Sequence, residues 1–110
     1  MGSGLLGQVQ IFMKSAELVY HTQDYTSATI LYFKALFVAL DLVILRRIKK
    51  TPKDHSERFR ILEQYFPEEY RYLDQYFSIY QSTYTITVDK ETCEEIRAYV
   101  TNLVAKNIGI

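Results

Sequence analysis

The chain has 110 residues, of which 48% are hydrophobic and 15% aromatic, with four glycines and two prolines. This composition excludes disordered, collagen-like and linker sequences, and the length fits a single domain over residues 1–110. Thirteen basic residues balance thirteen acidic ones, so the overall charge favours neither a nucleic acid nor any other highly charged partner. A function that depends on charge must therefore come from local clusters.

The cysteine count and the apolar segments bear on cellular location. Cys93 has no second cysteine with which to pair, which favours a reducing cytoplasm. Residues 1–4 resemble a cloning remnant, and the start of the chain lacks the basic stretch of a signal peptide. The apolar run 27–45 contains Lys34 and Asp41, each of which costs about 2.5–3.5 kcal/mol near the centre of a membrane helix. We therefore expect a cytoplasmic protein with no membrane partner.

Apolar residues recur at helical spacing in five segments, which predicts an all-α fold, an antiparallel bundle of four to five helices. The expected helices cover about residues 5–20, 25–48, 56–65, 67–84 and 90–107. Asp24 and Asp89 precede the second and fifth helices as N-caps, and Pro67 suits the first turn of the fourth. Pro52 ends any helix before it, and residues 83–88 form a joint with a β-strand tendency.

The second expected helix carries apolar side chains on nearly all of its faces, Phe33, Phe37 and Ile44 among them. Such a helix needs neighbours on several sides. We expect a chain this short not to supply them all, which predicts a homodimer through this helix. Lys34 and Asp41 are seven residues apart, too far to pair within the helix, so we expect each to reach solvent or a partner.

The densest charge cluster is segment 46–60, which holds seven basic and two acidic residues. Basic side chains at a helix end and loop can hold phosphates by Coulomb attraction and bidentate hydrogen bonds. The same cations also complement the dipole at the carboxyl end of the second helix, which needs no ligand. Both interpretations stay open. The candidate ligand-binding residues at this corner are Arg47, Lys53, His55 and Arg58.

No set of residues has the pattern of an active site. His55 has no second reacting group and no zinc-ligand spacing around it, and Cys93 lies in an acidic stretch that would raise the pKa of its thiol. Four tyrosines repeat every fourth residue in the fourth helix: Tyr72, Tyr76, Tyr80 and Tyr84. Such a stripe can stack bases, but more often it is a half-buried helix face. We predict no catalytic residue, no metal and no cofactor.

The order and spacing of several segments resemble the HEPN superfamily, helical domains that often accompany nucleotidyltransferases in prokaryotes. The matching segments are 24–28, 32–36, 39–41, 52–55 and 80–84. They are similar to the family's helix pair, its Pro-Lys-x-His loop and its Tyr-x-Ser-x-Tyr segment, over about residues 14–105. The resemblance implies a bundle of four or five helices, often dimeric, with a nucleotidyltransferase subunit as a partner.

Active members of this family are toxin-like, metal-independent ribonucleases that use an arginine followed, after four to six residues, by a histidine. In this chain Arg46 and Arg47 precede His55 by eight and seven intervening residues, and Thr83 stands where the family has an arginine. The prediction is therefore a non-catalytic HEPN-like binding module that engages a nucleotidyltransferase partner or a nucleotide or RNA phosphate. The alternatives are a ribonuclease with a drifted Arg/His motif and a purely structural interaction protein.

Overall fold

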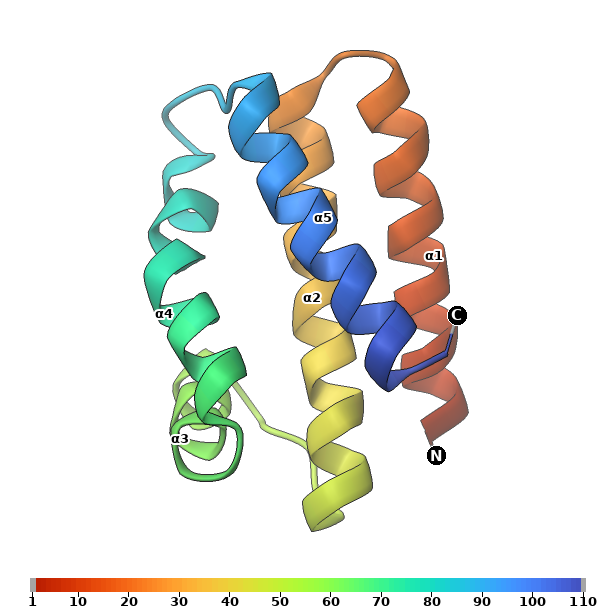
Figure 1. Ribbon diagram of the computed structural model, residues 1–110, viewed down its shortest axis with the longest axis vertical. Helices are drawn as coiled ribbons and strands as arrows, with labels where there is room; N and C mark the ends of the chain where they lie inside the picture. The colour runs from red at the N-terminus through yellow and green to blue at the C-terminus, as the bar shows by residue number, and fades with distance from the viewer. Residues whose placement is uncertain (1, 110) are drawn as a thin grey trace.

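A computed structural model describes residues 2–109 of the chain, with side chains from residue 4 onward (Figure 1). The elements are α1 (Gly2–His21), α2 (Tyr25–Ile48), α3 (His55–Tyr65), α4 (Pro67–Ser82) and α5 (Lys90–Asn107). The described residues contain no strand, so the predicted all-α bundle is confirmed. The joint at 83–88 forms turns and bends instead of β-structure.

Side-chain caps fix where most of these helices begin. Asp24 accepts a hydrogen bond from the Ser27 N–H at 3.0 Å, and Asp89 accepts one from the Thr92 N–H at 2.8 Å. Each cap supplies an acceptor to a backbone donor that the first helical turn leaves free. The two N-caps proposed from the sequence are therefore confirmed.

The end of α4 falls two residues earlier than the sequence pattern predicts. Ser82 and Thr83 turn their hydroxyls back onto the helix, donating to the carbonyls of Ile79 and Tyr80 at 2.8 and 2.6 Å. These side chains compete with the backbone for acceptors in the last turn, as short hydroxyl side chains do. The helix stops at Ser82, and Tyr84 lies beyond it, 81% exposed.

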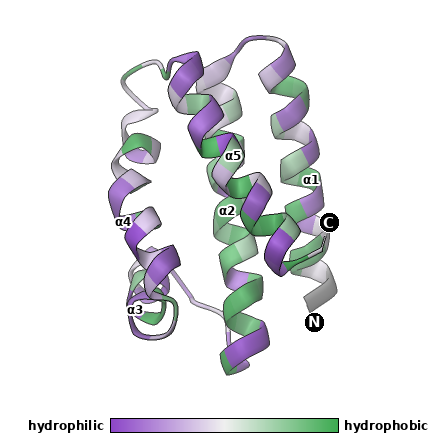
Figure 2. Cartoon of the chain, in the orientation of Figure 1, coloured by the Kyte–Doolittle hydropathy of each residue, from purple (hydrophilic) through white to green (hydrophobic). Residues whose placement is uncertain are grey.

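Helix α2 is the centre of the bundle. A tight turn at residues 22–24 folds α1 back antiparallel along it, α5 crosses in front of it, and the α3–α4 pair lies on the remaining side in Figure 1. Figure 2 shows α2 as the most continuously apolar helix, whereas α1, α4 and α5 alternate between apolar and polar residues. The amphipathic helices thus turn their apolar faces toward α2.

The packing shows that one premise of the predicted homodimer is wrong. Among the described residues of α2 no large apolar side chain is exposed, and eleven of its residues are buried by the chain's own helices. A central helix in a five-helix bundle can be covered on three sides without a second copy. The helix is long and apolar enough to cross a membrane, but 61% of its apolar window is buried inside the bundle. The homodimer itself stays a prediction.

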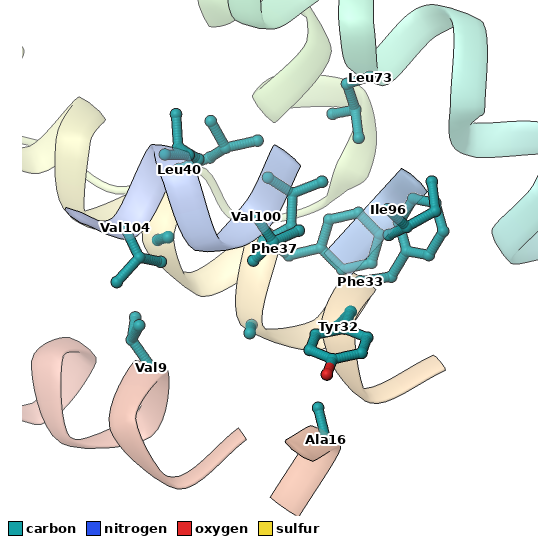
Figure 3. Close-up of a cluster of buried hydrophobic side chains, with 14 of the residues drawn as sticks. Val9, Ala16, Tyr32, Phe33, Phe37, Leu40, Leu73, Ile96, Val100 and Val104 are labelled. Carbon is teal, nitrogen blue, oxygen red and sulfur yellow. The ribbon is translucent and has the colours of Figure 1, made fainter. Parts of the chain in front are cut away.

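All five helices contribute buried side chains to the core, and Figure 3 shows part of this cluster. The side chains labelled there are Val9 and Ala16 of α1, Tyr32, Phe33, Phe37 and Leu40 of α2, Leu73 of α4, and Ile96, Val100 and Val104 of α5. At roughly 25 cal/mol per Å² of apolar surface removed from water, this cluster is the main source of stability.

We expect Leu36→Ala to lower the free energy of unfolding by about 3–5 kcal/mol, because it leaves a cavity where a fully buried leucine packs. Leu18→Ala is the matched control, since Leu18 is 63% exposed on α1. We expect it to change the stability by no more than about 0.5 kcal/mol. Urea unfolding followed by circular dichroism measures both. Equal losses in the two variants would contradict the central place of α2.

An ion pair joins α1 to α5 beside the amino-terminal half of α2. Arg97 donates from Nη2 to Glu17 Oε1 at 2.7 Å and from Nε to Oε2 at 2.8 Å, and the Tyr32 hydroxyl also donates to Glu17. The Arg97 guanidinium lies 4.3 Å from the centre of the Tyr20 ring. The hydrogen bonds from Arg97, more than that from Tyr32, hold the pKa of Glu17 at about 2 against an ordinary 4.5, although burial opposes the shift.

This lowered pKa predicts a pH-dependent contribution to stability. Because the folded-state pKa of Glu17 lies below the unfolded value, the contribution is complete above about pH 4.5 and is lost as the pH falls toward 2. Both side chains are about one-third exposed, so we expect about 1 kcal/mol after solvent screening. Unfolding free energies between pH 2 and 6 should show a shallower slope in Glu17→Gln and in Arg97→Met than in the wild type. A slope unchanged in both variants would refute the assignment.

Candidate ligand-binding site

The connection from α2 to α3 sets up the predicted corner. Lys49 ends α2 in the left-handed conformation, at φ 64°. Asp54 then caps α3 by accepting from the Glu57 N–H at 2.8 Å, while Glu57 accepts from the backbone N–H of Lys53 at 3.0 Å. This arrangement is similar to a capping box, except that the glutamate accepts from the residue before the cap. Since the two carboxylates already accept from these backbone N–H groups, an anion at this corner would have to be held by side chains.

Arg58 is held inside the corner by Asp41. Its Nε and Nη2 donate to Asp41 Oδ1 and Oδ2 at 2.7 and 2.9 Å, and the arginine is only 8% exposed. This is the bidentate geometry that makes arginine–carboxylate pairs strong. The expectation that Asp41 reaches solvent or a partner is therefore corrected: its first partner is an arginine seventeen residues later in the same chain.

Arg58 also fixes the state of His55. The third described contact of the guanidinium joins Nη1 to His55 Nδ1 at 2.6 Å. A guanidinium only donates hydrogen bonds, so Nδ1 must accept, and the proton of the neutral ring is on Nε2. Burial, and next the charge of Arg58, lower the pKa of His55 below its usual 6.5. The imidazole is therefore neutral at pH 7, with an N–H at Nε2.

Three aromatic rings hold the imidazole in place. The ring centre of His55 lies 4.8 Å from that of Phe37, 5.2 Å from that of Phe77 and 6.4 Å from that of Tyr80. These rings come from α2 and α4, whereas His55 begins α3. The site is thus assembled from three helices, and its orientation depends on the packing of all three.

The four residues predicted as ligand-binding do not all converge. His55 and Arg58 are in contact, and Lys53 is exposed in the loop directly before them. Arg47 lies elsewhere: it donates to the Tyr65 carbonyl at 3.3 Å, and its guanidinium carbon lies 5.2 Å from the centre of the Phe66 ring. Tyr65 is the last residue of α3 and His55 the first, and an eleven-residue helix is about 16 Å long. Arg47 therefore lies at the opposite end of α3 from His55.

Several other cations of segment 46–60 serve the helix ends. Arg46 donates to the Asn107 carbonyl at the end of α5, and Lys49 donates from Nζ to the Arg46 carbonyl, both at 3.0 Å. Such contacts satisfy the carbonyls that a helix end leaves free. For these residues the dipole interpretation of the cluster holds. Lys50 and Lys53 are exposed, and neither ammonium group has an ion pair within the described residues.

The tyrosine stripe of α4 is mainly a packing face. Tyr72 stacks on Tyr99 of α5 with ring centres 3.4 Å apart and on Tyr76 at 4.4 Å, and the Tyr76 hydroxyl donates to Glu95. This agrees with the interpretation of the stripe as a half-buried helix face. From the sequence, Tyr80 was assigned to that stripe and to the Tyr-x-Ser-x-Tyr segment, and its contact with His55 was not predicted.

Metal binding and nucleophilic catalysis by a cysteine find no support among the described residues. No group of three or more histidine, cysteine or carboxylate side chains there could hold a metal ion. Cys93 is fully buried on α5, and its burial raises the pKa of the thiol. A buried thiol with a raised pKa is a poor nucleophile.

A double-mutant cycle tests the Asp41–Arg58 pair. We expect Asp41→Ala to cost about 3–5 kcal/mol of unfolding free energy, because it leaves a buried guanidinium without its carboxylate. The matched variant Asp41→Ala/Arg58→Met removes both charges and should recover most of that loss, measured by urea unfolding. A double variant as unstable as Asp41→Ala alone would show that the charges are not coupled.

Comparison of the chain with protein-family models, with curated proteins and with solved structures finds no match to it. The likeness to the HEPN superfamily therefore depends on the motifs quoted above and enters the functional argument as a proposal.

Proposed function

We propose that the chain is a HEPN-like, non-catalytic binding module that holds a phosphate of a nucleotide or an RNA at the corner of α2 and α3. The single observation that carries the proposal is the fixed state of His55, whose Nδ1 is occupied by Arg58. Its Nε2–H is then a hydrogen-bond donor with no partner among the described residues. Exposed Lys53 and Lys50 add positive charge in the adjoining loop.

The same geometry argues against catalysis. A general base needs a free lone pair, but Nδ1 accepts from Arg58 and Nε2 carries the proton. The arginine in contact with His55 is Arg58, which is buried and bound to Asp41 through two hydrogen bonds, so it is not available to stabilise charge on a reacting phosphate. A binding role therefore fits the site better than the ribonuclease alternative.

The remaining parts of the proposal come from the sequence patterns and the resemblance, and not from the site. They are a dimeric assembly, a nucleotidyltransferase subunit as a partner, and a cytoplasmic location in a prokaryote. A hydrogen-bond donor beside lysines recognises the phosphate of a nucleotide as well as that of an RNA. Experiments must therefore separate these two sources.

The binding test uses two fluorescent probes in parallel, a labelled adenosine 5′-monophosphate and a labelled single-stranded RNA decamer, each titrated by anisotropy at low and high salt. We expect salt-sensitive binding of one probe. His55→Ala should weaken it about tenfold, because a hydrogen bond to a charged group contributes about 1.5–3 kcal/mol. His21→Ala is the control, since His21 is an exposed histidine at the end of α1.

Three outcomes contradict the proposal. If neither probe binds, or if His55→Ala binds as the wild type does, the protein has no phosphate site at this corner. If the RNA is cleaved in the presence of a chelator, and the cleavage is lost in His55→Ala, the ribonuclease alternative replaces the binding module.

A further inference from the structure

Tyr84 differs from the other tyrosines of the α4 stripe. Tyr72 and Tyr76 stack on each other, and Tyr80 packs against rings of α2. Tyr84 follows the end of α4 and is 81% exposed, and within the described part of the chain no aromatic ring packs against it. The packing of the bundle therefore does not account for this ring.

The backbone on both sides of Tyr84 is fixed. The Thr83 N–H donates to the Tyr80 carbonyl at 3.2 Å. The Thr85 N–H donates to the Ser82 carbonyl at 2.9 Å. A ring presented to solvent from a fixed backbone loses little freedom when a flat partner stacks on it, and such preorganisation favours binding.

Tyr80 connects Tyr84 to His55. The ring centre of Tyr80 lies 6.4 Å from that of His55. Burial raises the pKa of the Tyr80 hydroxyl, and so do the charge and the hydrogen bonding of Tyr84, so the two hydroxyl groups are neighbours. One tyrosine side chain thus separates the exposed ring of Tyr84 from the Nε2–H of His55. A nucleotide carries its base and its phosphate at the two ends of one ribose, which is a span of this order.

Lys34 supplies a positive charge on the His55 side. It lies three residues before Phe37 on the same surface of α2, and the Phe37 ring centre is 4.8 Å from that of His55. Burial and the charge of Arg58 lower the pKa of His55 most, and the charge of Lys34 lowers it further. The Lys34 ammonium has no ion pair among the described residues. A phosphate at Nε2 of His55 therefore has a cation beside it.

We infer that the site binds one nucleoside phosphate unit, with its phosphate between His55 Nε2 and Lys34 and its base stacked on the exposed ring of Tyr84. Every base has a π face, so a tyrosine accepts any of them. The unit is a free nucleotide or part of a single-stranded RNA, because the bases of a duplex are already stacked on one another. The inference rests on the phosphate site of the proposed function and adds a base subsite and a cation to it.

Fluorescence tests the base subsite directly. The chain contains no tryptophan, so Tyr84→Trp places a single fluorophore there. We expect adenosine 5′-monophosphate to quench this fluorescence and ribose 5-phosphate, which has no base, to leave it unchanged. Tyr65→Trp is the matched control, since Tyr65 is an exposed tyrosine at the other end of α3 from His55, and neither ligand should quench it.

The same variant separates the two sources of the ligand. It is titrated with adenosine 5′-monophosphate and with the single-stranded RNA decamer, and the one that quenches at the lower concentration is the preferred source. Quenching by either supports the inference. If neither quenches Tyr84→Trp at concentrations that saturate binding of the labelled probes, the inference is overturned.

Competition against the labelled adenosine 5′-monophosphate measures what the base contributes. In the wild type we expect the unlabelled nucleotide to displace the probe at a concentration about tenfold lower than ribose 5-phosphate does. Tyr84→Ala should abolish this preference, because both competitors then bind through the phosphate alone, whereas Tyr84→Phe should keep it. Ile86→Ala changes an exposed residue of the same loop and should keep it too. An undiminished preference in Tyr84→Ala refutes the base subsite.

Lys34 is tested in the same competition. We expect Lys34→Met to weaken the nucleotide and ribose 5-phosphate by the same factor, about fivefold, because the lysine contacts the phosphate that both carry. Lys34→Arg should retain binding, and Lys14→Met, which changes an exposed lysine of α1, should not affect it. Wild-type affinity of Lys34→Met for both competitors contradicts the assignment of Lys34.

The base subsite and the phosphate site can fail separately. If His55→Ala weakens both competitors but the nucleotide does not quench Tyr84→Trp, the base subsite is refuted and the phosphate site of the proposed function stands. If the nucleotide quenches Tyr84→Trp equally well with and without the additional change His55→Ala, the phosphate site is refuted and the base subsite stands alone.

Discussion

The burial of α2 is the constraint on which the rest of the structure depends. A helix with apolar side chains on most of its faces is not stable alone in water, so every other helix is placed to cover it. A three-residue turn returns α1 along it, α5 crosses it, and the α3–α4 pair closes the third side. The face that carries Lys34 and Asp41 stays partly open, and both charges of the helix interior lie on that face.

The buried Asp41–Arg58 pair follows from that arrangement. Asp41 lies at the edge of α2, where α3 packs against that helix, and Arg58 of α3 donates hydrogen bonds to its carboxylate. A buried arginine is costly to desolvate, so its three contacts with Asp41 and His55 must all be kept for the corner to be stable. An arginine held in this way cannot move to bind a ligand, and it prevents His55 from acting as a base.

The sequence predicted the elements better than the contacts between them. Helical spacing and the caps Asp24 and Asp89 are local signals, and they were sufficient to predict the helices. The pairs Asp41–Arg58 and Glu17–Arg97 join residues 17 and 80 positions apart, which no local pattern encodes. Arg58 therefore counted in the sequence as one more cation of a basic cluster, although its charge is neutralised inside the fold. The neighbours of His55 on α2 and α4 could not be predicted either, because they too are distant in the sequence.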